Sequence, residues 1–280
     1  MRVLITGARG LLGSAVAREF RADAVTVLDR QHLDVTDEAA VRAAVDRARP
    51  ELIVNCAAYN NVDEAETQAQ RALEVNAFAV LTLAEAARRS GAVLVHYSSD
   101  FVFDGESDRP YTEQDVPSPR SVYAASKLLG DWFALESPRA YVLRVESLFG
   151  RPGPGGARMG SLGTIVQKIR DEVEVPVFVD RTVSPSYTAD VARATRAIVE
   201  RGLEPGLYHC VNEGAATWLE IAEESASILG KPLRAKPLTL DTVALVARRP
   251  RYCALSVGKL AAAGIVMPHW KDALRRFLAE

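Results

Sequence analysis

Short apolar runs alternate with amphipathic segments along the first half of this chain. The runs cover residues 3–5, 25–28, 52–54, 93–95 and 141–143. Strands that are buried on both faces have this continuous apolar character, and helices connect such strands across the faces of a parallel sheet. The pattern therefore predicts an α/β protein whose main element is a doubly wound parallel sheet.

A glycine-rich turn follows the first apolar run directly and reads T-G-A-R-G-L-L-G. Gly7 permits a tight turn, Gly10 lets a pyrophosphate approach the backbone, and Gly13 permits close packing of helix on strand. The N–H groups at the helix end favour an anion. The turn predicts dinucleotide binding on a Rossmann-type sheet, the alternative being an ordinary strand–helix turn. The expected contacts are Gly7, Gly10, Leu11, Leu12 and Gly13.

The alternation of apolar runs and amphipathic segments is less regular after Gly150. Residues 151–163 are rich in glycine and proline, which predicts a loop. Beyond it we expect strands at 175–179 and 207–211, a helix from about 189, and a helix over 218–229. We interpret residues 1–150 as a dinucleotide-binding domain. Residues 151–280 would be mainly a smaller C-terminal substrate lobe, with elements that return to the main sheet.

Composition narrows the classes of function. The chain has 280 residues, 48% of them hydrophobic, which is enough for a sizeable core, and its net charge of -2 suggests no nucleic-acid or membrane partner. Cys56, Cys210 and Cys253 are odd in number and far apart, as expected of reduced thiols in a cytoplasmic protein. The four histidines lack metal-ligand spacing, so we expect no metal site.

Tyr123 and Lys127 are four residues apart in an apolar-periodic segment, 122–135, that predicts a helix. Residues at this spacing share a helix face, and a cation beside a phenol lowers the pKa of the phenol. Such a tyrosine can act as a general acid or base near neutral pH. Ser98 and Ser99 lie at the end of the fourth predicted strand. With the glycine turn, these residues predict a nicotinamide-dependent oxidoreductase.

Longer motifs give a more specific resemblance. Residues 55–66 read N-C-A-A-Y-N-N-V-D-E-A-E, residues 96–105 read H-Y-S-S-D-F-V-F-D-G, and residues 121–130 read S-V-Y-A-A-S-K-L-L-G. Arg249-Pro250 with Leu255 and Lys259 adds a C-terminal match. The chain resembles the dTDP-4-dehydrorhamnose reductases of the extended short-chain dehydrogenase/reductase superfamily over nearly its whole length. These enzymes reduce the C4 ketone of a nucleotide sugar with NADH or NADPH.

The resemblance implies roles for particular residues. Tyr123 would donate a proton to the sugar oxygen. Lys127 would lower the pKa of Tyr123 and hold the nicotinamide ribose, and Ser99 would hydrogen-bond the sugar carbonyl. Further cofactor contacts would be Asp34, Val35, Ala57, Ala58, Tyr59 and, more weakly, Tyr97. The expected substrate contacts are Ser99, Asp100, Val62, Ser147 and Arg249.

The residues after the second strand leave the choice of cofactor open. Asp29 stands at the end of the second strand, where an acidic residue binds the ribose hydroxyls of NAD and repels a 2′-phosphate. Arg30, which follows it, can pair with that phosphate instead. We therefore expect both NADH and NADPH to be used.

The sequence departs from the family pattern on the substrate side. Ser147 stands where the family has a tryptophan that contacts the sugar, and Glu146 precedes it. Arg181 offers a partner either for the substrate diphosphate or for Glu146, with which it could simply pair on the loop surface. Cys253 stands where serine is usual. These changes predict the same reaction with a shifted preference among sugars.

Two alternatives stay open. One is another enzyme of the superfamily that acts on a different nucleotide sugar; a dehydratase would need an acidic residue where Phe101 stands beside Asp100. The other is a non-catalytic regulatory subunit like the beta subunit of methionine adenosyltransferase, which resembles the reductases. A homodimer is the assembly that we expect.

Overall fold

The computed structural model describes residues 1–153 and 159–280 of the chain. Within these ranges, six strands form one parallel sheet in the order β10-β5-β4-β3-β1-β2. The predicted α/β class and doubly wound parallel sheet are thereby confirmed. The strands are β1 (Arg2–Thr6), β2 (Ala24–Leu28), β3 (Leu52–Asn55), β4 (Val93–Ser99), β5 (Ala140–Val145) and β10 (Gly206–His209).

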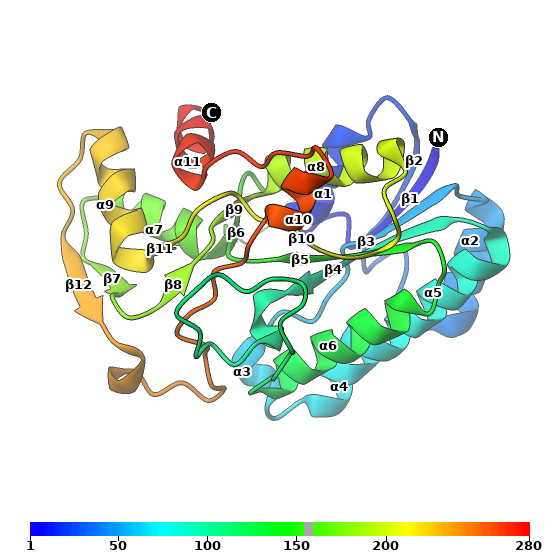
Figure 1. Ribbon diagram of the computed structural model, residues 1–280, viewed down its shortest axis with the longest axis horizontal. Helices are drawn as coiled ribbons and strands as arrows, with labels where there is room; N and C mark the ends of the chain where they lie inside the picture. The colour runs from blue at the N-terminus through cyan, green and yellow to red at the C-terminus, as the bar shows by residue number, and fades with distance from the viewer. Residues whose placement is uncertain (154–158) are drawn as a thin grey trace.

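Helices cover both faces of this sheet (Figure 1). One face is covered by α1 (Leu11–Glu19) and α8 (Thr188–Arg201), and the other by α2 (Glu38–Ala48), α5 (Ala79–Ser90) and α6 (Val122–Leu135). Because side chains alternate along a strand, Val3 and Ile5 pack in the cluster of α1 and α8, whereas Leu4 packs in that of α2 and α5. Both clusters are apolar, which explains the continuous apolar runs.

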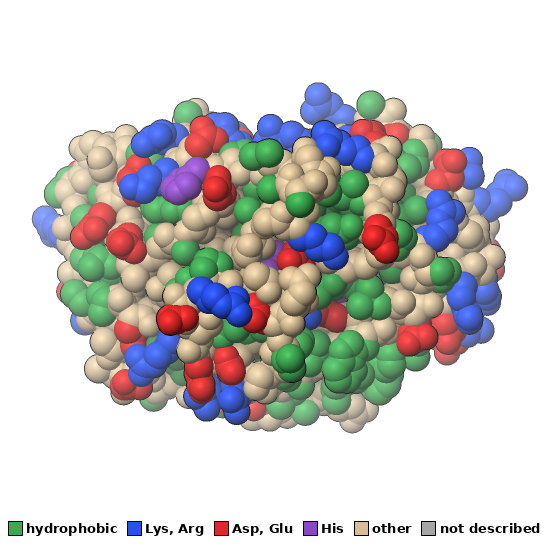
Figure 2. Space-filling view, viewed as in Figure 1, with side chains coloured by type: hydrophobic (Ala, Val, Ile, Leu, Met, Phe, Trp, Pro, Cys, Tyr) green, Lys and Arg blue, Asp and Glu red, His purple; other side chains and the backbone are tan. Residues whose placement is uncertain are grey.

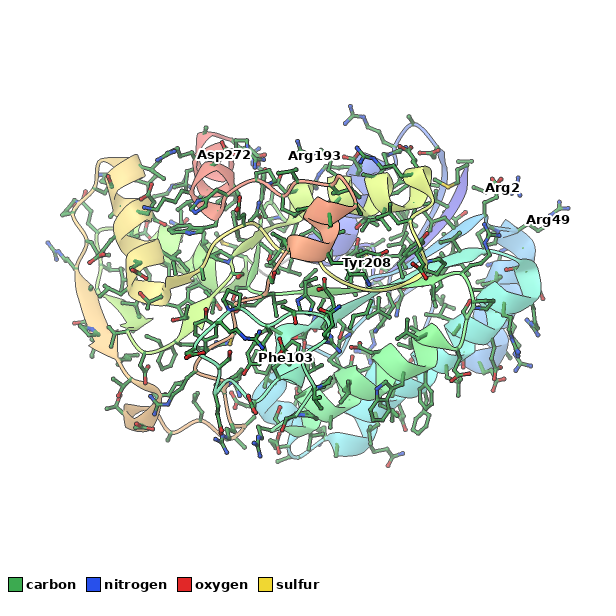
Figure 3. All side chains as sticks on the ribbon, viewed as in Figure 1. Arg2, Arg49, Phe103, Arg193, Tyr208 and Asp272 are labelled. Atoms are coloured by element: carbon green, nitrogen blue, oxygen red, sulfur yellow. The ribbon has the colours of Figure 1, made fainter. Side chains whose placement is uncertain are left out.

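The chain order in the sheet reverses between β1 and β3, which pair in register from Val3 with Leu52 to Thr6 with Asn55. In open α/β sheets, ligands bind outside the carboxyl ends of the strands at such a point. Arg2 and Arg49, labelled in Figure 3, lie at the opposite, amino-terminal end of the strands, where Arg2 Nε donates to the Arg49 carbonyl at 2.6 Å. The topology alone thus selects one edge of the sheet as the candidate site.

The helical region between β3 and β4 is divided into several short pieces. It comprises α3 (Val62–Ala65), α4 (Ala69–Leu73), the π-helical turn η1 (Glu74–Phe78) and α5. The π turn brings Asn76 against α6, where a Cβ placed on Gly130 would lie 2.1 Å from the Asn76 carbonyl oxygen. The Asn76 side chain accepts a hydrogen bond from Tyr59 N at 2.8 Å and donates to Tyr59 O at 3.0 Å. The turn therefore holds the segment that follows β3.

A smaller lobe faces the carboxyl ends of the strands, on the left of Figure 1. Its apolar core includes Phe149, Val177, Ile221 and Leu274. Its elements are β6 (Leu148–Phe149), α7 (Gly160–Arg170), β7 (Val175–Phe178), β8 (Thr182–Val183), β9 (Ser186–Tyr187), β11 (Ala216–Thr217), α9 (Trp218–Leu229), β12 (Ala235–Leu238) and α11 (Trp270–Ala279). Three short helices complete the described elements: η2 (Asp100–Val102), η3 (Leu240–Thr242) and α10 (Gly258–Ala262).

The loop predicted over residues 151–163 ends earlier than expected, because α7 begins at Gly160. Leu162, Ile165 and Ile169 bury one face of this helix in the lobe core, and that burial outweighs the weak helix propensity of its glycines. Residues 154–158 of the predicted loop lie outside the described residues. In the described ranges no helix combines the length and the apolar character needed to cross a membrane.

Candidate active site

Two adjoining hollows lie along the carboxyl edge of the sheet and share Gly10, Ala57 and Ala58 among their walls. The first, about 430 Å³, lies at the ends of β1 and β2, and the second, about 420 Å³, lies at the ends of β3, β4 and β5. The predicted residues in the first are Gly7, Gly10, Asp29, Arg30, Asp34, Val35, Ala57, Ala58 and Tyr59. Those in the second are Gly10, Leu11, Leu12, Gly13, Ala57, Ala58, Val62, Tyr97, Ser99, Asp100, Tyr123, Lys127 and Ser147.

The glycine turn is too tightly packed for larger residues. Gly7 has a φ of +64°, and a Cβ there would lie 2.5 Å from the backbone carbon of Cys56. A Cβ on Gly13 would lie 2.3 Å from the Gly7 carbonyl oxygen. Since α1 begins at Leu11, its unpaired N–H groups lie at the meeting point of the two hollows. The turn therefore fits the pyrophosphate of a dinucleotide.

Asp29 is already engaged by neighbouring side chains in the first hollow. Its Oδ2 pairs with Arg9 Nε at 2.7 Å, and its Oδ1 accepts from Gln31 N at 2.8 Å and lies 2.7 Å from His32 Nδ1. Burial by itself would raise the pKa of Asp29, but these partners together lower it. Arg9 and Arg30 are both exposed along the hollow. Arg9 was missed from the sequence, although a basic residue inside the glycine turn was a usable signal.

Asp34 and Val35 occupy the far wall of the first hollow. Asp34 Oδ1 accepts from both the backbone N–H and the hydroxyl of Thr36, at 3.0 and 2.7 Å, which orders the loop. Its other oxygen lies 3.5 Å from Arg71 Nη2, on α4. Arg71 also lines this hollow and is a second basic residue that the sequence motifs did not reveal. Together with Arg9 and Arg30 it makes this end of the site suited to a phosphorylated ligand.

Ser99, Tyr123 and Lys127 come together in the second hollow. Ser99 is the last residue of β4, and the other two lie in the first two turns of α6. Ser121 caps that helix by accepting a hydrogen bond from Ala124 N at 3.2 Å, which sets where the first turn begins. All three of these side chains are buried. A hydroxyl, a phenol and an ammonium thus border one space.

The relation between Lys127 and Tyr123 differs from the sequence prediction. Lys127 Nζ donates to the Tyr97 carbonyl oxygen at 2.7 Å. Burial raises the pKa of Tyr123, and the nearby carboxyl of Asp100 adds to the rise, while the Ser99 hydroxyl opposes it. Burial also lowers the pKa of Lys127 to about 8. The predicted lowering of the phenol pKa is therefore wrong for this structure, and the Tyr123 phenol stays neutral.

Tyr97 contacts Lys127 through its backbone carbonyl and not through its phenol. Its phenol oxygen lies 2.6 Å from Thr195 Oγ1 on α8, and its ring belongs to the core cluster under α1 and α8. Its carbonyl is the acceptor that holds Lys127. The side chain still borders the second hollow, but its polar end is directed to α8.

Arg249 is the one predicted site residue that lines neither of these hollows. Its Nη2 pairs with Asp63 at 2.7 Å, and it lines a separate space of about 490 Å³ with Asp104 and Arg251. Its guanidinium carbon lies 6.0 Å from the centre of the Phe101 ring, and the same ring contacts Tyr123 edge-on at 5.5 Å. Arg249 therefore lies outside the second hollow, behind Phe101, which lines it.

Glu146 is not on a loop surface. Its side chain is 2% exposed, and Oε2 accepts from Ser184 N at 2.5 Å. It borders the second hollow beside Ser147, whose φ of +42° is unusual for a residue other than glycine. The interpretation of Glu146 and Arg181 as a surface pair is therefore wrong, because the lobe folds over the segment after β5.

This fold and site define a nucleotide-binding oxidoreductase of the short-chain dehydrogenase/reductase type. The glycine turn, the strand-end serine and the Tyr-x-x-x-Lys helix all border one continuous edge of a Rossmann-type sheet. The family model described as the RmlD substrate binding domain matches residues 1–280. The chain belongs to the dTDP-4-dehydrorhamnose reductase family.

Known relatives cover almost the whole chain. A dTDP-4-dehydrorhamnose reductase of Streptomyces griseus is 40% identical, over 98% of this chain and 91% of that protein. A probable dTDP-4,6-dihydroxy-2-methyloxan-3-one 4-ketoreductase of Streptomyces antibioticus is 38% identical, over 98% and 94%. The crystal structure of dTDP-4-dehydrorhamnose reductase from Bacillus anthracis in complex with NADP is 31% identical, with a TM-score of 0.93 over 99% of this chain and 98% of that one.

Proposed function

We propose that this protein reduces the C4 ketone of a dTDP-linked 4-keto-6-deoxy sugar, with dTDP-4-dehydrorhamnose as substrate and dTDP-rhamnose as product. The observation that carries the proposal is the convergence of Ser99, Tyr123 and Lys127 on one hollow at the carboxyl edge of the sheet. The names of the Streptomyces griseus and Bacillus anthracis relatives support the same substrate.

The chain's own residues account for the proton part of the reaction. The nicotinamide cofactor, when bound, supplies the hydride. The Tyr123 phenol is neutral and buried beside Ser99, so it can donate its proton to the ketone oxygen while Ser99 orients that oxygen. Lys127 places a positive charge near the phenol as negative charge develops on the phenol oxygen. Ala57, Ala58 and Leu11 would exclude water from the reacting atoms.

NADPH and NADH are both proposed as reductants. The pyrophosphate would lie on the glycine turn, and the adenosine end would lie between Asp34 and the arginines Arg9, Arg30 and Arg71. The guanidinium groups favour a 2′-phosphate, whereas Asp29 would favour free ribose hydroxyls if Arg9 did not already engage it.

The test is oxidation of NADPH and NADH in the presence of a panel of 4-keto nucleotide sugars. Consumption with dTDP-4-dehydrorhamnose and formation of dTDP-rhamnose, identified by mass spectrometry, are the expected results. Consumption only with another nucleotide sugar would assign a different substrate within the superfamily. Cofactor binding without consumption on any sugar would support the non-catalytic regulatory subunit and end this proposal.

We also propose that cofactor and substrate are bound mainly by different parts of the chain. Residues 1–150 would bind the cofactor, and residues 151–280 would mainly bind substrate while returning β10 and α8 to the main sheet. Its support is that β10 pairs with β5 and that α8 packs beside α1. The three cysteines, all free in the structure, support a reducing, cytoplasmic setting.

The proposed assembly is a homodimer formed across the outer face of α6. Trp132 and Leu135 are 59% and 41% exposed, and Phe78 from the adjoining η1 is 52% exposed. Hydrophobic side chains gather in the lower part of Figure 2, where α6 runs in Figure 1. The molar mass from light scattering should be twice that of one chain and should fall to one chain in Trp132→Asp.

A further inference from the structure

Four side chains from separate segments meet on the lobe side of the second hollow. Asp100 begins η2, Glu146 follows β5, Arg181 precedes β8, and Cys253 lies in the segment after η3. The carboxylate oxygens of Asp100 and Glu146 and the sulfur of Cys253 lie within 4.8 Å of one another, at 3%, 2% and 1% exposure. The two carboxyl groups border the same space as Ser99 and Tyr123.

Each of the two carboxyl groups has one satisfied and one unsatisfied oxygen. Asp100 Oδ1 accepts from the Ser99 hydroxyl at 2.9 Å, and Glu146 Oε2 accepts from Ser184 N. Asp100 Oδ2 and Glu146 Oε1 are buried and have no partner among the described residues. Buried polar atoms in folded proteins are nearly always paired, so these two oxygens point to a ligand that carries hydrogen-bond donors.

The charges of the cluster favour a shared proton rather than a bound cation. Arg181 Nη2 lies 3.7 Å from Cys253 Sγ, so its guanidinium already supplies a positive charge. Burial raises the pKa of Asp100 to about 6 against the opposing charge of Arg181. Burial also raises the pKa of Glu146 well above its ordinary value, and the Asp100 carboxyl adds to that rise. Burial also raises the pKa of Cys253, which keeps the thiol protonated. With the nearby Tyr252 phenol neutral, two carboxyl groups face one cation, and one of them retains a proton.

We propose that Glu146 is a specificity-determining residue which, with Asp100, binds the hydroxyl on the ring carbon next to the ketone, the C3 hydroxyl. The inference rests on the proposed reduction of a C4 ketone. Ser99 and Tyr123 would hold the ketone oxygen. Asp100 and Glu146 border the same hollow with one unpartnered oxygen each, so these oxygens would meet a group beside the reacting carbon. Of the two carbons beside C4 in a 6-deoxy sugar, only C3 carries a hydroxyl.

The shared proton makes the pair suited to a hydroxyl in particular. A hydroxyl donates one hydrogen bond and accepts others, so it can donate to the ionised carboxylate and accept from the protonated one. A 3-deoxy sugar would leave both buried oxygens unpaired, which sites built for a hydroxyl reject strongly. The protein would therefore require a substrate that retains the C3 hydroxyl.

The test compares kcat/KM for dTDP-4-dehydrorhamnose and its 3-deoxy analogue. The native protein should prefer the hydroxyl-bearing sugar by at least about a hundredfold. In Glu146→Gln the amide oxygen can still accept from Ser184 N, while the amide N–H₂ donates to Asp100 and removes the shared proton. The preference should then fall by about tenfold or more, with an unchanged dissociation constant for NADPH and an unchanged melting temperature.

A matched control is available in Glu113→Gln. Glu113 also accepts a backbone hydrogen bond, from His209 N at 2.8 Å, but does not border either hollow of the site. Its substrate preference should equal that of the native protein. Equal use of both sugars by the native protein, or an unchanged preference in Glu146→Gln, would overturn the assignment of Glu146.

Binding measurements on the native protein test the C3-hydroxyl subsite independently of the proposed reduction. Calorimetry with dTDP-rhamnose and its 3-deoxy analogue requires neither turnover nor a variant. Tighter binding of the 3-hydroxy sugar by about tenfold or more supports the subsite even if no ketone is reduced, whereas equal binding overturns it. If neither ketone is reduced, the proposed reaction fails and the binding result still decides the role of the carboxyl pair.

Discussion

Lys127 donates a hydrogen bond to the backbone carbonyl oxygen of Tyr97 at 2.7 Å, thirty residues away in sequence. This bond joins the middle of α6 to β4 and fixes the ammonium group beneath the second hollow, where the side chain is 2% exposed. Burial outweighs the opposing charge of Asp131, so the pKa of Lys127 falls to about 8. The lysine thus has two functions to test, in positioning α6 and in charging the site.

Removal of the phenol hydroxyl should separate chemistry from binding. Tyr123→Phe should lower turnover by roughly a hundredfold or more, because the proton donor is lost while the ring still packs on Phe101. The dissociation constant for NADPH should not change. Tyr208→Phe, which removes a buried hydroxyl that donates to the Glu204 carbonyl, is the matched control and should remain active. Near-native turnover of Tyr123→Phe would remove this residue from the mechanism.

The reaction should lose rate on the alkaline side as Lys127 is deprotonated. Its pKa in the folded protein is about 8, well below the usual 10.5, so the charged form is present below about pH 8 and is lost above it. The logarithm of kcat/KM should therefore decline above about pH 8. Lys127→Met should be slow at every pH and should lack this decline. A native profile that is flat to pH 10 would show that the charge is not needed.

Arg9 should control the choice of cofactor through Asp29. While Arg9 engages the carboxylate, we expect kcat/KM for NADH and NADPH to differ by less than about a thousandfold. In Arg9→Ala the freed carboxylate can accept from ribose hydroxyls and repel a 2′-phosphate, which should shift the ratio toward NADH by roughly tenfold. Arg47→Ala, at an exposed position on α2, should leave the ratio unchanged. A shift toward NADPH would contradict this reading of Asp29.

Gly130 should be intolerant of even one added methyl group. A Cβ would lie 2.1 Å from the Asn76 carbonyl oxygen in the π turn, so α6 and η1 would have to separate. Gly130→Ala should lower the free energy of unfolding by about 1–3 kcal/mol. Denaturant titration measures the change, and Gly258→Ala, whose Cβ would meet only a serine hydroxyl at 3.3 Å, serves as the control. Equal stability of the two variants would mean that the π turn can adjust.

Ser147 should influence which sugar is preferred. Its side chain borders the second hollow, and a tryptophan there would add an apolar face that can bury about 150–250 Å². Ser147→Trp should improve reduction of dTDP-4-dehydrorhamnose relative to bulkier or more polar 4-keto sugars. Competition assays on substrate mixtures measure the ranking. An unchanged ranking would show that residue 147 does not contact the sugar.

Local patterns were sufficient for the framework of this protein. The alternation of apolar runs and amphipathic segments predicted the parallel sheet, and helix spacing placed Tyr123 and Lys127 on adjacent turns of α6, whose observed bounds match the predicted segment. The glycine turn predicted close packing of backbone on backbone, and the structure shows it at Gly7 and Gly13, where an added Cβ would clash. These features depend on residues close in sequence, where the periodicity of helix and strand sets which side chains share a face.

Only the tertiary structure decided how distant segments meet at the site. The contacts of Arg9 with Asp29, of Lys127 with Tyr97, and of Glu146 with Asp100 each join residues at least twenty apart. No local periodicity specifies such pairs, because they depend on how the lobe packs over the sheet and on which groups burial deprives of water. Burial by that packing reversed the predicted pKa shift of Tyr123 and moved Glu146 from an assumed surface into the wall of the second hollow.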